Sequence, residues 1–152
     1  MSLLVGVGNP WRRDDGVGPV VAHRVASLGL SGVDVVVESE PLALLEHLPR
    51  RDTVVVVDAG APGPRPGRVS VLSVAAEPLP RHRSAVSPHG LGVAEVVELA
   101  RVLGPLPARL VLVTVESCEV TLGPGLSPPV ADHLDDAVAA VVGVLTSGAD
   151  QR

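Results

Sequence analysis

The stretch that decides the fold is residues 2–38, which read SLLVGVGNPWRRDDGVGPVVAHRVASLGLSGVDVVVE. It opens with an apolar run at Ser2–Val7 and passes through a loop of Gly, Asn, Pro and Asp. It then enters Val17–Leu28, where apolar residues recur at three- and four-residue spacing, and a second Val-rich run follows at Asp34–Glu38. This alternation predicts strand, helix, strand, and the two strands are expected to be parallel because a helix connects them. The opening therefore predicts an α/β fold.

The rest of the chain continues the alternation of short Val-rich runs and helical segments. We predict further strands at Thr53–Val57, Arg68–Val74 and Arg109–Val115, and further helices at Pro41–Leu48, Gly92–Leu103 and Pro129–Leu145. The expected architecture is a three-layer α/β/α sandwich, with one domain over residues 1–146 and a flexible tail at 147–152. Ligands of such folds bind at the carboxyl ends of the strands, where the strand order reverses. If the first and third strands are neighbours, the loops that follow them line a common crevice.

Composition excludes several classes of protein. The 152 residues are 46% hydrophobic and 19% charged, which is typical of a folded domain rather than a disordered chain. A net charge of −5 and a single aromatic residue, Trp11, argue against binding to nucleic acid or to an anionic membrane. The single cysteine, Cys118, cannot form an internal disulfide, and no apolar run is long enough to span a bilayer. We expect no signal peptide and a cytoplasmic location.

Carboxylates stand where the predicted crevice would be. Asp14 and Asp15 occupy the loop after the first strand, and Asp58 is expected to close the third strand. One of these two residues has a simpler interpretation as the N-cap of the following helix, and Asp14 is the preferred candidate for that role. A carboxylate at the end of a buried Val run is costly unless it is solvated, capped or liganded. Asp15 and Asp58 are therefore expected to face the same crevice.

His89 is the third candidate, because it lies at a loop-to-helix junction near the strand ends. Two carboxylates and an imidazole suit a divalent first-row metal and leave coordination positions open. From the spacing of these residues alone, a metal site and three unrelated polar residues are equally good interpretations. The remaining histidines are interpreted as surface or capping residues: His23, His47, His82 and His133.

Other chemistries fit the sequence less well. A dinucleotide fingerprint fails because Trp11 stands where its third glycine belongs. A triad of Ser87, His89 and Asp58 lacks the G-x-S-x-G turn, and acidic neighbours disfavour a reactive thiolate at Cys118. Glu116 follows the fifth predicted strand, and we weigh equally a role in the crevice and a solvated position.

Four motifs occur in order along the chain. They are Gly6-x-Gly8-Asn9-x-x-x-x-Asp14-Asp15-Gly16-x-Gly18, Val57-Asp58-Ala59, Ser87-Pro88-His89-Gly90-Leu91 and Gly123-x-Gly125-Leu126-Ser127-Pro128. Together they resemble the motifs of the [NiFe]-hydrogenase maturation proteases, the endopeptidases that trim the C-terminus of the hydrogenase large-subunit precursor. The first motif is long and specific, whereas the others count mainly by their order.

The resemblance implies a mixed five-stranded sheet of order 2-1-3-5-4 with strand 4 antiparallel. It also implies that Asp15, Asp58 and His89 form the catalytic and metal-contacting set. In that family the nickel belongs to the precursor, so we expect no permanently bound cofactor, although another divalent ion could occupy the site in vitro. Which of the two carboxylates activates water stays open.

The implied partner is the large-subunit precursor, met by a monomer of this chain. We expect Asn9, Trp11 and Glu116 to contact that substrate, with Trp11 as an apolar anchor. Arg12 and Arg13 stand at positions that are often apolar or small in the family. This departure affects the expected local contacts with the partner and not the acid that follows. The alternatives are a non-catalytic checkpoint or chaperone module that binds the same precursor, and a peptidase of the same fold with another client.

Overall fold

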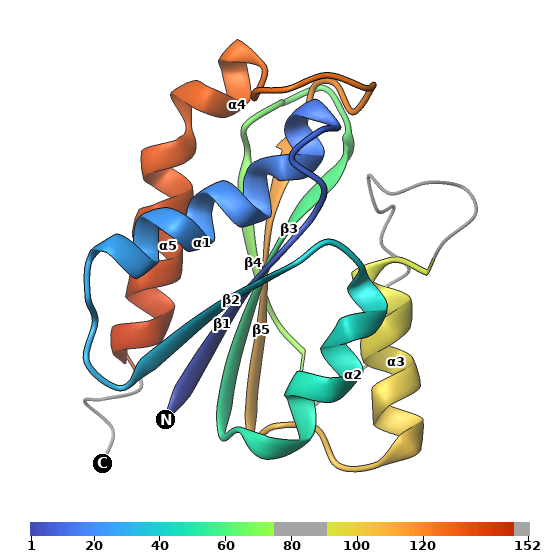
Figure 1. Cartoon of the computed structure of the whole chain (residues 1–152), viewed down its shortest axis with the longest axis vertical. Helices are drawn as coiled ribbons and strands as arrows, with labels where there is room; N and C mark the ends of the chain where they lie inside the picture. Colours follow the sequence, from blue (N-terminus) through green and yellow to red (C-terminus); the bar gives the residue numbers. More distant parts are fainter. Residues whose placement is uncertain (75–90, 148–152) are drawn as a thin grey trace.

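The computed structural model describes residues 1–74 and 91–147, and a five-stranded sheet forms its centre (Figure 1). The strand order is β2-β1-β3-β5-β4, with β4 antiparallel to β5 and the other neighbours parallel. The strands are β1 (Ser2–Val7), β2 (Val33–Glu38), β3 (Thr53–Pro62), β4 (Val69–Ser73) and β5 (Arg109–Ser117). The predicted three-layer fold and strand order are confirmed.

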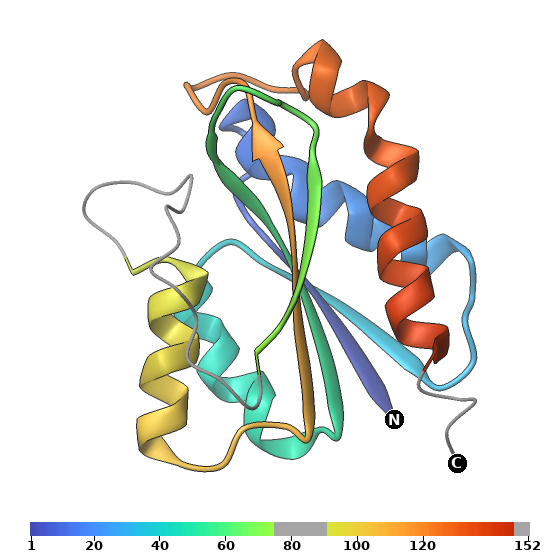
Figure 2. The same cartoon turned by 180° about the vertical axis from the view of Figure 1, so that it is seen from behind.

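Helices cover both faces of the sheet, as Figures 1 and 2 show from opposite sides. Helices α1 and α5 lie on one face with α4 at one end of α5, and helices α2 and α3 lie on the other face. The helices are α1 (Val17–Ser27), α2 (Leu44–His47), α3 (Val93–Leu103), α4 (Pro128–Asp132) and α5 (Leu134–Ser147), with short 3-10 segments η1 (Arg13–Gly16), η2 (Pro41–Ala43) and η3 (Leu48–Arg50). Within the described residues, none of these helices has the length and apolar character that crossing a membrane requires.

The core consists of Val, Leu and Ala in two layers, one on each face of the sheet. Successive side chains of a strand point to opposite faces. Val55 and Val57 of β3 accordingly pack in the layer that holds α1 and α5, while Val54 and Val56 pack in the layer that holds α2 and α3. All four are at most 1% exposed. The continuous Val run thus places β3 in the middle of the sheet.

β3 is longer than its sequence predicts, and the prediction that Asp58 closes this strand is wrong. The strand continues to Pro62 because residues 59–62 pair with β5, although Ala, Gly and Pro are weak strand formers. Asp58 pairs with Thr114 of β5, whereas the pairing of β3 with β1 ends at Val57. Asp58 is therefore the first residue of β3 beyond the paired part of β1.

The last predicted helix, Pro129–Leu145, is two helices. α4 ends at Asp132 and α5 begins at Leu134, with His133 between them. The break coincides with a close approach of the β3–β4 loop, because a Cβ atom on Gly67 would lie 2.5 Å from Nδ1 of His133. Helix α5 runs to Ser147, one residue into the expected tail, and residues 148–152 lie outside the described part of the chain.

Candidate active site

The loop between β1 and α1 is folded back against the start of the helix. Gly8 has a φ of +147°, and a Cβ atom there would lie 1.8 Å from the carbonyl oxygen of Asp15, so only glycine fits. Oδ1 of Asn9 accepts a hydrogen bond from the N–H of Trp11 at 2.9 Å, which closes an Asx turn. The side chain of Asn9 is thus engaged within the loop.

Asp15 is held at the carboxyl end of β1 by this loop. Its side chain is 6% exposed, and Oδ2 accepts the backbone N–H of Asn9 at 2.9 Å. Oδ1 has no hydrogen-bond partner among the described residues. Burial raises the pKa of Asp15; the Asn9 hydrogen bond and the charge of Arg12 oppose that rise, while the negative charge of Glu40 adds to it.

Asp58 lies close enough to Asp15 for the two charges to interact, just beyond the point where the pairing of β3 with β1 ends. It is 3% exposed, and its Oδ1 also has no partner within residues 1–74 and 91–147. Burial and, to a smaller extent, the negative charge of Asp15 raise the pKa of Asp58, a hydrogen bond from the Ala59 backbone opposes the rise, and the net value is about 8. At neutral pH this carboxyl is therefore largely protonated.

The Asp15–Asp58 pair has the chemistry of a cation site. Two buried carboxylates that repel each other, each with an oxygen that nothing in the described chain engages, are stabilised by a proton or by a metal ion. Carboxylate oxygens bind divalent metals, and perturbed carboxyl groups in a crevice are typical of functional sites. The pair can also take a proton from a water molecule when one member is ionised.

His89, the predicted third member of the set, lies outside the described residues, as does His82. Within the described ranges, no group of three His, Cys, Asp or Glu side chains is arranged to hold a metal ion. The role of His89 as a third metal contact stays a prediction.

Glu116 lines a pocket beside the carboxylate pair. The pocket has a volume of about 410 Å³ and contains Asp58, Thr114 and Arg68 among its lining residues. One carboxylate oxygen of Glu116 accepts the backbone N–H of Arg65, so the side chain also fixes the β3–β4 loop. Glu116 is half-buried and reaches the pocket that Asp58 also lines, and its role in contacting a substrate stays a prediction.

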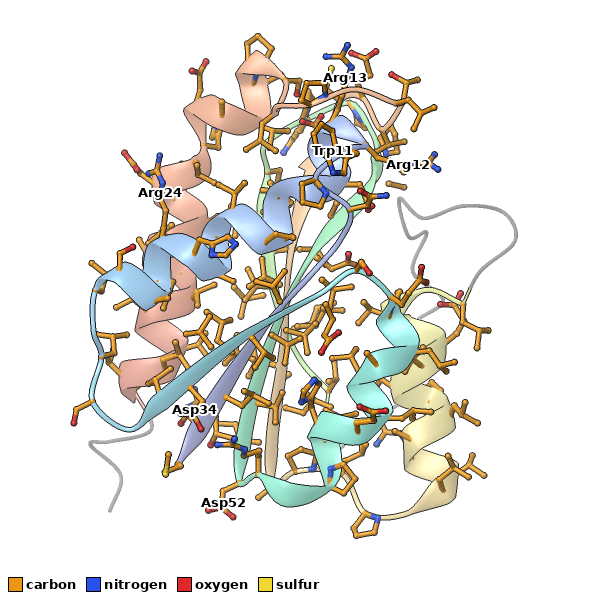
Figure 3. All side chains as sticks on the ribbon, in the orientation of Figure 1. Trp11, Arg12, Arg13, Arg24, Asp34 and Asp52 are labelled. Atoms are coloured by element: carbon orange, nitrogen blue, oxygen red, sulfur yellow. The ribbon has the colours of Figure 1, made fainter. Side chains whose placement is uncertain are left out.

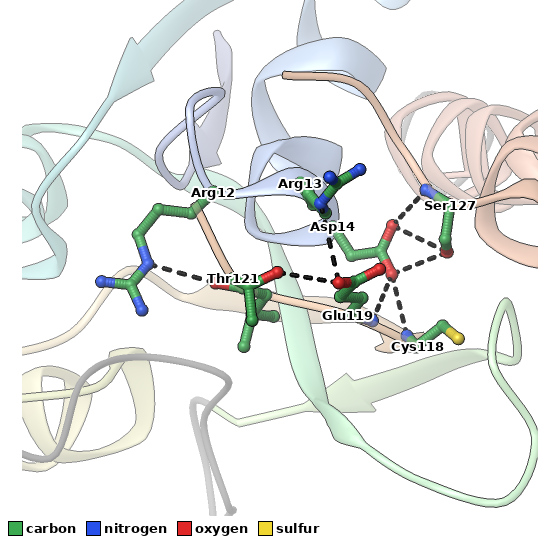
Figure 4. A network of polar contacts seen from close by, with 8 residues as sticks. Arg12, Arg13, Asp14, Cys118, Glu119, Thr121 and Ser127 are labelled. Carbon is green, nitrogen blue, oxygen red and sulfur yellow. Dashed lines mark hydrogen bonds and ion pairs between the residues drawn. The ribbon is translucent and has the colours of Figure 1, made fainter. Parts of the chain in front are cut away.

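Asp14 does not cap α1, and that interpretation is wrong. Its carboxylate is fully buried and accepts the backbone N–H groups of Cys118, Glu119 and Ser127, each at 2.8 Å (Figure 4). The hydroxyl of Ser127 donates to the same carboxylate at 2.7 Å. Burial alone would raise the pKa of Asp14, but these hydrogen bonds together hold it below its ordinary value. Asp14 therefore fastens the 118–127 loop to the first loop.

The structural role of Asp14 could not be predicted from its neighbours in the sequence, because its hydrogen-bond partners lie in residues 118–127. Ser127, in the motif that ends at Pro128, lies 113 residues from Asp14, and nothing in local spacing links the two. Trp11, by contrast, lies as expected on the surface, with 69% of its area exposed. Figure 3 shows Trp11, Arg12 and Arg13 together at the end of the molecule opposite Asp34 and Asp52.

Comparisons with known proteins agree on one family. Residues 38–144 match the model of a family described as hydrogenase maturation protease. The chain is 30% identical over 149 residues to the hydrogenase expression/formation protein HupD of Bradyrhizobium diazoefficiens, covering 94% of this chain and 77% of the relative. It is 28% identical over 154 residues to the hydrogenase 2 maturation protease of Escherichia coli, covering 94% and 89%.

Solved structures show the same similarity. The hydrogenase maturating endopeptidase HybD of E. coli superposes with a TM-score of 0.79 at 25% identity, over 97% of this chain and 93% of that one. The [NiFe] hydrogenase maturation protease HybD of Thermococcus kodakarensis has the same fold, with a TM-score of 0.73 at 23% identity over 94% and 97%.

Proposed function

The chain belongs to the hydrogenase maturation protease family, and we propose that it is the endopeptidase that removes the C-terminal extension of a nickel-loaded [NiFe]-hydrogenase large-subunit precursor. The observation that carries this proposal is the Asp15–Asp58 pair. Both carboxylates are buried at the carboxyl ends of adjacent strands, and each keeps one oxygen without a partner in the described structure.

In this proposal the nickel is part of the substrate. Asp15 and Asp58 contact the ion that the precursor carries, with His89 as the expected third contact. Nickel polarises a nearby carbonyl or activates a water molecule. The carboxylate that the metal does not fully engage takes the proton of the attacking water.

The raised pKa of Asp58 supports the expectation that a precursor without metal is a poor substrate. Without a cation, the two carboxylates retain a proton and have no positive charge to balance them. A nickel ion displaces that proton and stabilises both ionised groups, so binding energy becomes available only when the precursor is loaded. The chain thereby tests metal insertion before it cuts.

Incubation with the nickel-loaded precursor tests the proposal. We expect mass spectrometry to show a shortened large subunit and a released C-terminal peptide, and the metal-free precursor to stay intact. Asp58→Asn should abolish the release, whereas Asp135→Asn, which alters an exposed carboxylate paired with Arg24, should retain it. A stable complex with an intact precursor would instead identify a non-catalytic checkpoint module.

A further inference from the structure

Two loops close to the Asp15–Asp58 pair, residues 9–16 and 118–127, form an exposed apolar surface that we call the loop pair. Trp11 is 69% exposed and Leu122 is 79% exposed. Arg12 forms a parallel β-bridge with Gly123, so Trp11 and Leu122 occupy neighbouring positions on the two segments. The only aromatic residue of the sequence and the most exposed leucine among residues 1–74 and 91–147 therefore occupy neighbouring positions.

Backbone and side-chain hydrogen bonds join the two halves of the loop pair. The N–H of Gly123 donates to the carbonyl of Trp11 at 2.8 Å, and the N–H of Arg13 donates back to Gly123 at 2.9 Å. Beneath them, the buried carboxylate of Asp14 accepts three backbone N–H groups of the second loop. A surface ordered before binding loses little conformational entropy when a partner docks.

Basic groups flank the apolar positions. Arg12 donates through Nε to the carbonyl of Val120, while the rest of its guanidinium points away from the loop (Figure 4). The guanidinium of Arg13 lies against Gly123, with Nε 3.7 Å from a carboxylate oxygen of Glu119. Two arginines therefore accompany Trp11 at one end of a chain whose net charge is −5.

The loop pair is also continuous with the site. Asn9 belongs to the first loop, and its backbone N–H donates to Asp15. A protein whose metal reaches Asp15 therefore comes close to the first loop, which carries both Asp15 and Trp11. Trp and Arg on a preformed surface are the residues that dominate binding energy in protein interfaces.

We propose that the loop pair is a docking surface for the hydrogenase precursor, and that it takes an apolar segment bearing carboxylates beside the metal centre. This proposal rests on the proposed function, because the occupant is the same substrate. Trp11 and Leu122 bury against the apolar part of the segment, and Arg12 and Arg13 face its carboxylates. Asp14 is a positioning residue, since it orders this surface without reaching the partner.

Steady-state kinetics on the nickel-loaded precursor encoded in the same genome tests the docking surface. The double variant Trp11→Ala/Leu122→Ala should raise KM about tenfold or more with little change in kcat, because it removes binding contacts and no reacting group. The matched control is Val102→Ala/Leu103→Ala on α3, where the residues are 83% and 69% exposed. The control should leave KM unchanged.

Salt and charge variants test the expected carboxylates. Raising NaCl from about 0.05 to 0.3 M should increase KM for the wild type, because salt screens exposed charges. Arg12→Ala/Arg13→Ala should reduce that salt dependence, whereas Arg24→Ala, a matched exposed arginine, should not. Equal salt dependence in both variants would contradict the assigned charge of the partner.

The failures of the two proposals are distinguishable. If the wild type cuts the precursor and the Trp11/Leu122 variant keeps its KM, the docking surface is wrong and the function stands. If the wild type binds without cutting, the function is wrong, and the dissociation constant measures the docking surface directly. Dimerisation of the isolated chain that is lost in the same variant would assign the loop pair to a second copy and overturn the proposal.

Discussion

Asp14 and Asp15 are adjacent, and both are buried, but their surroundings differ in kind. Asp14 accepts three backbone N–H groups and a hydroxyl, and its pKa lies below the ordinary value. Asp15, like Asp58, keeps an oxygen that no described residue engages, and its pKa is raised. A saturated carboxylate stabilises the fold, whereas an unsaturated one costs stability and is available for chemistry.

The largest expected effect is the loss of processing activity when Asp15 or Asp58 is substituted, the two carboxylates that keep an oxygen without a partner in the described structure. Asp58→Asn and Asp15→Asn should each lower precursor processing by about a thousandfold, because in the proposed function each substitution removes a metal contact and a candidate general base. Peptide release followed by mass spectrometry measures the loss. The fold should persist, with an unchanged circular dichroism spectrum. If either variant processes the precursor at the wild-type rate, the substituted residue does not belong to the active site.

Asp14→Ala should produce the opposite profile, with a large loss of stability. It leaves the N–H groups of Cys118, Glu119 and Ser127 without their acceptor, at a cost of about 3 kcal/mol in the free energy of unfolding. Urea unfolding measures this cost. Ser127→Ala removes only the hydroxyl and should cost about 1 kcal/mol. A stability loss in Asp58→Asn as large as that in Asp14→Ala would break the comparison.

The pH dependence of the free energy of unfolding should distinguish Asp58 from Asp14, because their pKa values shift in opposite directions. The raised pKa of Asp58, about 8, means that the folded state holds a proton that the unfolded state releases near pH 3.8. Stability should therefore fall as pH rises between these values, by at most about 1.4 kcal/mol per pH unit from this group. The lowered pKa of Asp14 acts oppositely, since its contribution is present above pH 3.8 and is lost below it.

Urea unfolding at pH 5 and at pH 7 measures this dependence. Asp58→Asn should flatten the profile between the two values, whereas Asp135→Asn, at an exposed position, should follow the wild type. An unchanged slope in Asp58→Asn would show that another group holds the proton.

The smallest expected effect concerns the turn that carries Asp15. Asn9→Ala removes the hydrogen bond from Trp11 N–H to Oδ1 but leaves the backbone bond to Asp15, so it should cost about 1 kcal/mol of stability. Processing should fall only a fewfold. Ser27→Ala, which removes an exposed hydroxyl bond on α1, is the control. A loss of activity as large as that of Asp15→Asn would place Asn9 at the reacting atoms.

Local pattern succeeded where a segment is apolar along its whole length and failed where a distant partner decides the structure. β1 has its predicted limits, Ser2–Val7, because the apolar run itself marks where the strand begins and ends. β3 exceeds its prediction by the residues 58–62, whose strand conformation depends on pairing with β5. The break at His133 likewise coincides with the packing of Gly67 against it, which local helix periodicity does not contain.

The sequence by itself determined the layered fold and brought Asp15 and Asp58 to one crevice, because parallel strands in this order end at the same edge of the sheet. Only the tertiary structure decided the fate of the third carboxylate. The donors that saturate Asp14 lie 104 to 113 residues away, so no local pattern distinguishes it from its neighbour. The packing of distant loops decides which buried carboxylate oxygens are hydrogen-bonded. It separates Asp14 from Asp15 and Asp58, each of which keeps an oxygen without a partner among the described residues.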